Sequence, residues 1–256
     1  MKKLNNKTTL ITGATSGIGR ACALFFAAEG SNLILNARRE EPLFQLKEEL
    51  ETKYGISCHV SKCDVRDLTS VKEFVKSIPE SFQKVDILIN NAGLARGFDA
   101  VQTGSIEDWD EMIDTNIKGL LYITREVLPL MTAHNEGHII NLGSAAGHDV
   151  YPKGNVYCAT KYAVKALSEG FRMDLLEHGI KVTSVDPGMV ETNFSVIRFH
   201  GDEDKAKNVY KGFDPLTAED IADVILFAAT RPLNVNLNQI IMTPRAQANT
   251  IFISRK

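Results

Sequence analysis

Short apolar runs, rich in Val, Ile and Leu, alternate along the chain with longer segments in which apolar residues recur at helical spacing. The apolar runs occupy residues 8–12, 32–36, 58–63, 85–90, 137–142, 181–185 and 239–243. The longer segments occupy residues 18–29, 42–54, 69–77, 106–131, 156–178 and 218–229. Strands that are apolar throughout are typical of a parallel sheet with helices on both faces.

This alternation predicts an α/β fold of the Rossmann type, with a doubly wound, seven-stranded parallel sheet. No repeat and no linker rich in Pro, Gly or Ser interrupts the pattern, so we expect residues 1–256 to form a single domain. The stretch at about 190–214 is polar, rich in charge and long for a connection in such a fold. We interpret it as a lid near a ligand site at the carboxyl ends of the strands.

Composition and charge narrow the function classes. Apolar residues make up 44% and charged residues 24% of the 256 residues, as in ordinary soluble globular proteins. The formal net charge of -3 gives no general attraction to nucleic acid or to an anionic membrane. The four cysteines form no C-x-x-C pair and have no companion histidine at metal-ligand spacing, so we expect no metal site and a reduced, cytoplasmic location. The apolar run from Leu10 is interrupted at once by Thr12-Gly13, so we interpret the start as a mature N-terminus.

A glycine-rich turn joins the first predicted strand to the first predicted helix. Residues 12–19 read TGATSGIG, a G-x-x-x-G-x-G spacing. Glycines allow the backbone to turn sharply and approach a pyrophosphate, and the free N–H groups of the new helix face the anion. A glycine cluster alone is often only a structural turn, but its place between strand and helix favours a dinucleotide site.

The end of the second predicted strand indicates which dinucleotide is bound. An acidic residue there would hydrogen-bond the adenosine ribose of NAD, but residues 36–39 read NARR. Arg38 is a fixed cation able to hold a 2′-phosphate, which favours NADP. In the alternative interpretation, Arg38 and Arg39 are a solvated pair at a helix start, and Glu40 or Glu41 serves NAD.

Tyr157 and Lys161 are the strongest candidates for chemistry, because residues four apart project from the same face of a helix. A tyrosine hydroxyl with a pKa of about 10 is a poor base near neutral pH. An adjacent ammonium favours the phenolate, so we expect Lys161 to move the pKa of Tyr157 toward the working range. Such a pair is common on helix surfaces, and its interpretation depends on the surrounding motifs.

Two further polar residues complete the candidate site. Ser144 follows the predicted strand at 137–142, so its hydroxyl lies at the carboxyl edge of the sheet and can hydrogen-bond a substrate oxygen. Asn116 lies within the predicted helix at 106–131. Taken alone, Ser144 would be an ordinary turn residue, and Asn116 would be a polar residue that forms a hydrogen bond inside a helix. Their order after the glycine turn and the NNAG segment at 90–93 favours a catalytic set.

Together these motifs resemble the short-chain dehydrogenase/reductase family, over residues 8–242. The resemblance implies hydride transfer between nicotinamide C4 and a carbonyl carbon, with Tyr157 passing the proton. It also implies that Ser144 orients the substrate oxygen, that Lys161 binds nicotinamide ribose hydroxyls, and that Asn116 helps to hold a water that connects the site to solvent. Relatives are commonly homotetramers built on two long central helices, so we expect the same assembly.

The resemblance also implies a set of cofactor contacts around the NADP. The segments at 64–65 and 91–93 match positions that line the adenine and support the sheet, and the Pro-Gly segment at 187–188 matches the one beside the nicotinamide. The predicted cofactor-binding residues are Gly13, Thr15, Ser16, Gly17, Ile18, Gly19, Arg38, Arg39, Asp64, Val65, Asn91, Ala92, Gly93, Tyr157, Lys161, Pro187, Gly188, Val190 and Thr192.

The lid indicates the substrate class. Residues 194–202, together with 91–95 and 155–157, resemble the subgroup that oxidises serine, allo-threonine and other short 3-hydroxy acids and reduces malonic semialdehyde. Such substrates carry a carboxylate, and Arg198 is the candidate that binds it, beside Ser144 and Tyr157 at the reacting end. Arg96 is the second candidate. In the alternative, Arg198 pairs with an acidic residue at 202–204 on a solvated loop.

Two other functions remain open. A reductase of bulkier ketones or sugars would close its lid over apolar surface rather than over a carboxylate. A non-catalytic NADPH-binding redox sensor is the alternative outside enzymes, although such proteins usually lose the Tyr or the Lys that this chain retains.

Overall fold

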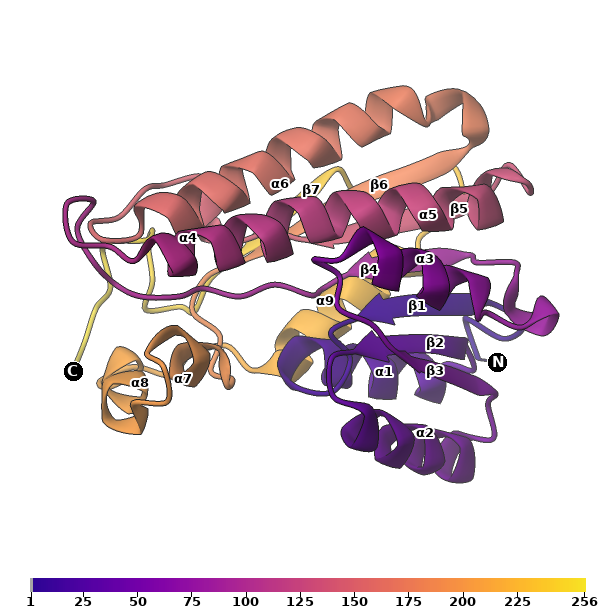
Figure 1. Ribbon diagram of the computed structural model, residues 1–256, viewed down its shortest axis with the longest axis horizontal. Helices are drawn as coiled ribbons and strands as arrows, with labels where there is room; N and C mark the ends of the chain where they lie inside the picture. The colour runs from indigo at the N-terminus through magenta and orange to yellow at the C-terminus, as the bar shows by residue number, and fades with distance from the viewer. Residues whose placement is uncertain (1) are drawn as a thin grey trace.

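The computed structural model describes residues 2–256, and its centre is one parallel sheet with the strand order β3-β2-β1-β4-β5-β6-β7 (Figure 1). The strands are β1 (Thr8–Thr12), β2 (Asn32–Ala37), β3 (Cys58–Lys62), β4 (Ile87–Asn90), β5 (Gly137–Leu142), β6 (Ile180–Pro187) and β7 (Gln239–Met242). The order reverses direction between β1 and β4, which is where doubly wound sheets bind their ligands. The predicted fold class is confirmed.

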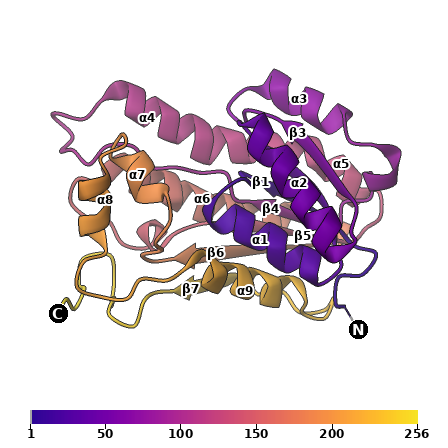
Figure 2. The same cartoon turned by 90° about the horizontal axis from the view of Figure 1, so that it is seen from below.

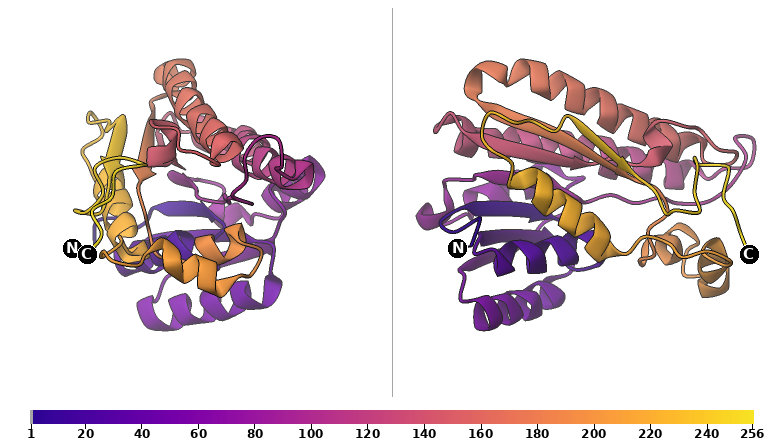
Figure 3. Two further views of the ribbon diagram at one scale, coloured as in Figure 1. Left: turned by 90° about the vertical axis from the view of Figure 1, so that its left-hand side faces the viewer. Right: turned by 180° about the vertical axis from the view of Figure 1, so that it is seen from behind.

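Helices cover both faces of this sheet (Figure 3). The helices are α1 (Gly17–Ala28), α2 (Glu40–Tyr54), α3 (Leu68–Lys76), α4 (Ile106–Ile113), α5 (Leu120–Thr132), α6 (Asn155–Asp174), α7 (Phe194–Arg198), α8 (Glu203–Val209) and α9 (Ala218–Ala229). Helices α1, α2 and α9 pack on one face, and α3, α5 and α6 pack on the other.

Strand β2 shows why the predicted strands are apolar throughout. Leu33 and Leu35 pack into the core beneath α1 and α2, whereas Ile34 between them packs into the opposite core beneath α3 and α5. All three side chains are fully buried. A strand whose alternate residues enter two hydrophobic cores has no polar face.

The segment predicted as a lid contains α7 and α8, which lie beyond the carboxyl ends of the strands (Figure 2). Asp202 begins α8 by accepting a hydrogen bond from the backbone N–H of Lys205. The C-terminal tail reaches the same end of the molecule, where Lys256 N donates to Gly212 O over 2.8 Å. Among the described residues 2–256, no helix is both long enough and apolar enough to cross a membrane.

Candidate active site

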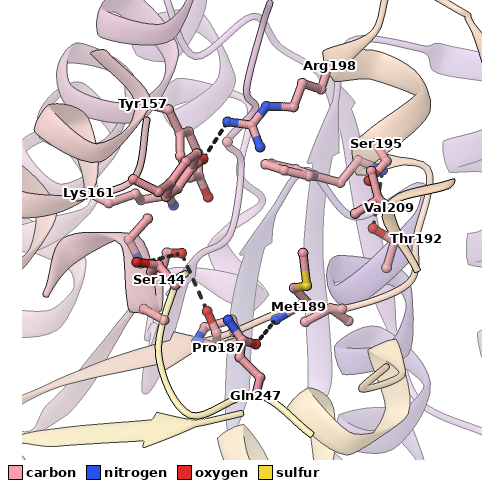
Figure 4. Close-up of a pocket in the computed structure, with 18 of the residues that line it drawn as sticks. Ser144, Tyr157, Lys161, Pro187, Met189, Thr192, Ser195, Arg198, Val209 and Gln247 are labelled. Atoms are coloured by element: carbon pink, nitrogen blue, oxygen red, sulfur yellow. Dashed lines mark hydrogen bonds between the residues drawn. The ribbon is translucent and has the colours of Figure 1, made fainter. Parts of the chain in front are cut away.

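A cavity of about 380 Å³ opens at the carboxyl edge of the sheet, and it collects residues that are far apart in the sequence (Figure 4). Ile18 follows β1, Gly93 follows β4, Ser144 follows β5, and α6 contributes Tyr157 and Lys161. The segment after β6, together with α7 and α8, supplies the opposite wall. The predicted residues lining this one cavity are Ile18, Asn91, Gly93, Ser144, Tyr157, Lys161, Pro187, Gly188, Val190, Thr192 and Arg198.

Lys161 and Tyr157 lie on the same face of α6, as predicted, and both are buried. Lys161 Nζ lies 5.9 Å from the centroid of the Tyr157 ring and donates a hydrogen bond to Leu142 O over 2.8 Å. Burial lowers the pKa of Lys161 to about 8, although the charge of Asp186 opposes that shift. The cation at this site is therefore easily deprotonated just above neutral pH.

The predicted direction of the Tyr157 shift is wrong for this structure. Burial raises the pKa of Tyr157 above its usual value, and the neighbouring Tyr151 adds to the rise. A hydrogen bond with Ser144 and the charge of Arg198 oppose it only in part. Desolvation of the phenolate therefore outweighs the charge of Arg198. In this pocket Tyr157 is a neutral phenol at neutral pH, which suits it to donate a proton to a carbonyl oxygen.

Ser144 turns its hydroxyl toward the reacting region. Its backbone is extended, and Oγ accepts a hydrogen bond from Ala146 N over 3.1 Å, beginning the short turn at 145–147. The same oxygen donates to Pro187 O over 3.4 Å. The Ser144 hydroxyl thus lies between the ends of β5 and β6, within hydrogen-bond reach of Tyr157.

Asn116 does not lie in a regular α-helix. The helix predicted at 106–131 is interrupted by a π-helical stretch at Asp114–Gly119, between α4 and α5. Within it, Asn116 Oδ1 accepts from Leu94 N over 2.9 Å, and Nδ2 donates to Leu94 O over 2.8 Å and to Thr160 Oγ1 over 3.0 Å. The wider turn thus ties the segment after β4 to α6, and such turns often mark functional sites.

The glycine turn has the geometry of a phosphate cradle. Gly13 and Gly17 have φ angles of +65° and +50°, which favour glycine. A side chain at Gly19 would begin 2.4 Å from Asn91 Nδ2, which itself donates to Thr12 O over 2.8 Å. Ser16 makes no side-chain cap to α1, and no acidic residue lies in the first turn. The first N–H groups of α1 are therefore available to an anion.

Arg38 lies at the end of β2 with about half of its side chain exposed, 3.5 Å from Glu111 Oε1. The same oxygen lies 3.2 Å from Arg66, which also binds Asp64 with NH2 2.6 Å from Oδ2. Arg39 is exposed at the start of α2, as are Glu40 and Glu41. Sequence reasoning missed Arg66, although its position directly after the predicted contacts Asp64 and Val65 was a usable signal.

The two candidate arginines for a substrate carboxylate differ clearly in their surroundings. Arg96 lies outside the main cavity: its Nε binds Glu111 over 2.6 Å, and NH1 donates to Ile197 O over 2.8 Å. Arg198 lines the cavity and donates to the Tyr151 hydroxyl over 2.5 Å. Its guanidinium carbon lies 5.2 Å from the Tyr157 ring centroid.

The alternative in which Arg198 pairs with the acidic residues at 202–204 finds no support in these contacts. Asp202 and Glu203 are paired with Lys205 and Lys207 instead. Arg198 is turned toward Tyr157 across the cavity (Figure 4). Sequence reasoning missed Tyr151 and the tail residues Gln247, Thr250 and Arg255, which also line the cavity. No short-range pattern links these residues to the site.

Comparison with known proteins agrees with this geometry. Residues 7–201 match the family described as short chain dehydrogenase. The chain belongs to the short-chain dehydrogenase family. It is 46% identical to the NADP-dependent 3-hydroxy acid dehydrogenase of Schizosaccharomyces pombe, over 100% of this chain and 99% of that protein.

Two further relatives of this short-chain dehydrogenase cover most of both chains. The sulfoacetaldehyde reductase 2 of Chromohalobacter salexigens is 45% identical over 95% of this chain and 96% of its own. The solved structure of the closed form of serine dehydrogenase complexed with NADP+ superposes with a TM-score of 0.90 at 41% identity, covering 97% of this chain and 99% of that one.

Proposed function

We propose that this short-chain dehydrogenase is an NADP-dependent oxidoreductase that interconverts a short 3-hydroxy acid and its carbonyl compound. The observation that carries the substrate class is the position of Arg198, a cation in the cavity wall beside the ring of Tyr157. The names of the relatives support the same class, since they refer to 3-hydroxy acids, serine or sulfoacetaldehyde. A carboxylate or a sulfonate is an anion that one arginine can bind.

The residues present fit NADP. The open N–H groups at the start of α1 suit the pyrophosphate, and a side chain at Gly13 or Gly19 would contact the segment at 91–92. Arg38 suits the 2′-phosphate, and the neighbouring Arg66 adds a second guanidinium nearby. NADP supplies the hydride-transfer chemistry when bound.

The proton is handled by Tyr157. Its raised pKa keeps the hydroxyl protonated at neutral pH, so in the direction of reduction it donates to the substrate oxygen. Ser144 holds the same oxygen by a hydrogen bond. Lys161 stabilises the phenolate that remains, because an ammonium near the ring offsets part of the cost of a buried negative charge. We assign Asn116 the task of supporting the path from Lys161 to solvent.

The substrate carboxylate is held by Arg198 together with Tyr151. The guanidinium is fixed by its hydrogen bond to the Tyr151 hydroxyl and by contacts with the rings of Phe98 and Phe194. Aromatic side chains exclude water from this part of the cavity and so strengthen the charge interaction. The closeness of Arg198 to the Tyr157 ring supports an acid whose carboxylate is near its reacting carbon.

A substrate screen tests this proposal. We expect turnover with NADP or NADPH for serine, 3-hydroxypropionate and malonic semialdehyde, and much weaker turnover with NAD. Bulky ketones and sugars, the competing enzyme class, should react poorly because Arg198 places a charge where they would need apolar surface. Absence of turnover with every acid, aldehyde and ketone, together with tight NADPH binding, would instead support the redox sensor.

The assembly and the location are further parts of this proposal. Exposed apolar side chains on α4 and α6, such as Ile106 and Met173, support a homotetramer that buries these two helices. The four cysteines are free and buried, which suits the cytoplasm. Light scattering on the purified protein measures the assembly directly, and a monomer at working concentration would contradict it.

A further inference from the structure

Asp186 is a buried acidic residue at the end of β6, and it has no role in the proposed mechanism. Only 1% of the residue is exposed, although most aspartates lie at protein surfaces. A buried carboxylate is costly unless hydrogen-bond donors compensate for its lost hydration. Its neighbours therefore indicate what it does.

Three side chains hold the Asp186 carboxyl group. Ser184 donates a hydrogen bond to Oδ1 over 2.5 Å, and Gln239 donates to Oδ2 over 2.8 Å. His148 Nε2 lies 2.8 Å from the same Oδ2. These partners come from β6, from β7 and from the turn after β5, so three separate elements converge on one acidic side chain.

The carboxyl group lies against the backbone segment to which Lys161 is hydrogen-bonded. A Cβ atom added at Gly143 would lie only 1.8 Å from Asp186 Oδ1. Residue 143 must therefore be glycine for Asp186 to occupy this place. Lys161 Nζ donates to the carbonyl of the preceding residue, Leu142, over 2.8 Å. Lys161 thus contacts Leu142, and Asp186 lies against the adjacent residue, Gly143.

Among the described residues 2–256, Asp186 is the acidic side chain whose charge acts on Lys161. Burial lowers the pKa of this lysine, and the charge of Asp186 is the one influence that raises it. Tyr157 and Asn116, the other polar residues that approach Lys161, carry no negative charge at neutral pH. Without Asp186, a lysine buried to this degree would lose its proton more easily still.

We propose that Asp186 is a positioning residue of the reaction, which holds the Lys161 ammonium charged and in place and is itself oriented by Ser184, His148 and Gln239. It touches neither substrate nor reacting atoms and acts only through Lys161. This inference rests on the proposed function, because a charged Lys161 matters only if Tyr157 handles a proton.

The pH dependence of NADPH-dependent reduction tests it. In the wild type, kcat/KM should fall as Lys161 loses its proton in alkaline solution. Asp186→Asn should move that fall to lower pH by roughly one unit, since one negative charge is lost near the ammonium. Ser184→Ala is the matched control, because it removes a hydrogen bond from the same cluster and leaves the charge. An equal shift in both variants would mean that packing, and not charge, is responsible.

Gln239 offers a second variant if Asp186→Asn does not fold. Its side chain is exposed at one end of the edge strand β7, so a substitution there leaves the core intact. Gln239→Lys places an ammonium beside the Asp186 carboxyl and should also move the alkaline fall to lower pH. Gln239→Met removes the hydrogen bond without adding charge, and its shift should be clearly smaller.

Competitive labelling of lysines with acetic anhydride, read by mass spectrometry across pH, reports the protonation of Lys161 without any turnover. Asp186→Asn and Gln239→Lys should both make Lys161 react at lower pH than in the wild type. If neither variant changes the labelling profile or the alkaline fall, the inference is wrong. Failure of the proposed function is distinguishable, since the wild type would then show no turnover while its labelling profile remained measurable.

Discussion

The guanidinium carbon of Arg198 lies 5.2 Å from the centroid of the Tyr157 ring, so the residue proposed to hold a carboxylate is next to the residue proposed to move the proton. A substrate that spans both groups must carry its anionic end close to its reacting carbon. Arg198 ends α7, whereas Tyr157 belongs to α6 on the opposite side of the cavity (Figure 4). The position of α7, which carries Arg198, therefore affects how long a substrate the site can accept.

Tyr157→Phe removes the transferable proton and keeps the ring. We expect turnover to fall by about two to four orders of magnitude, the usual contribution of a general acid or base. NADPH binding, measured by the fluorescence of the nicotinamide, should change little. Retention of near wild-type turnover would exclude Tyr157 as the acid.

Arg38→Asp should weaken the preference for NADP over NAD. The loss in NADP binding is expected at about 1.5–3 kcal/mol, the range for hydrogen bonds to a charged group, and toward its lower end because Arg38 is half exposed. Titration calorimetry with NADPH and NADH measures both affinities. NADH binding serves as the internal control and should not weaken. A wild type that used both cofactors equally well would contradict the assignment.

Arg198→Ala should raise KM for 3-hydroxy acids and lower kcat, because an anchored carboxylate also positions the reacting carbon. Comparison of an acid with its methyl ester isolates the charge: the wild type should prefer the acid, and the variant should lose most of that preference. Arg96→Ala is the matched control, since Arg96 is paired with Glu111 outside the cavity. Equal discrimination by wild type and Arg198→Ala would show that the carboxylate is held elsewhere.

The rate of NADPH-dependent reduction should fall as the pH rises through about 8. Burial lowers the pKa of Lys161 to about 8, so the ammonium is present below that pH and lost above it. Tyr157 does not produce the fall, because its pKa is raised and its proton is retained over the same range. Initial rates in overlapping buffers at constant ionic strength measure this decrease in rate at alkaline pH. A flat profile up to pH 10 would contradict the role of Lys161.

Gly19→Ala should weaken NADPH binding and lower the melting temperature together, because the new side chain would begin 2.4 Å from Gly13 O and from Asn91 Nδ2. Overpacking of this kind costs about 1–3 kcal/mol. Gly170→Ala in α6 is the control: a side chain there meets nothing within 4 Å, and alanine favours the helix by about 0.5–1 kcal/mol. Equal melting temperatures for Gly19→Ala and wild type would refute the close-packed turn.

The sheet could be predicted from the sequence with small errors at its edges. The expected strand at 85–90 begins two residues later, at Ile87, and β6 extends to Pro187 rather than ending at residue 185. The run at 32–36 is a reliable signal because both faces of the sheet are buried, so its three central residues, 33–35, are all apolar. The ends depend on hydrogen bonds to neighbouring strands, which no local pattern encodes.

By itself the sequence placed the glycine turn and Ser144 at the carboxyl edge of a parallel sheet, since each directly follows a predicted strand and right-handed crossovers set the strand direction. That Tyr157 and Lys161 join them there was implied by the resemblance to the family. Only the tertiary structure decided that Arg198 rather than Arg96 enters the cavity and that a π-helical turn presents Asn116 to Leu94. It also decided that burial raises the pKa of Tyr157, which Lys161 was expected to lower. These three outcomes depend on which atoms surround a side chain in space. Contacts between residues a hundred positions apart, such as Arg198 Nε with Gly97 O, leave no trace in local periodicity.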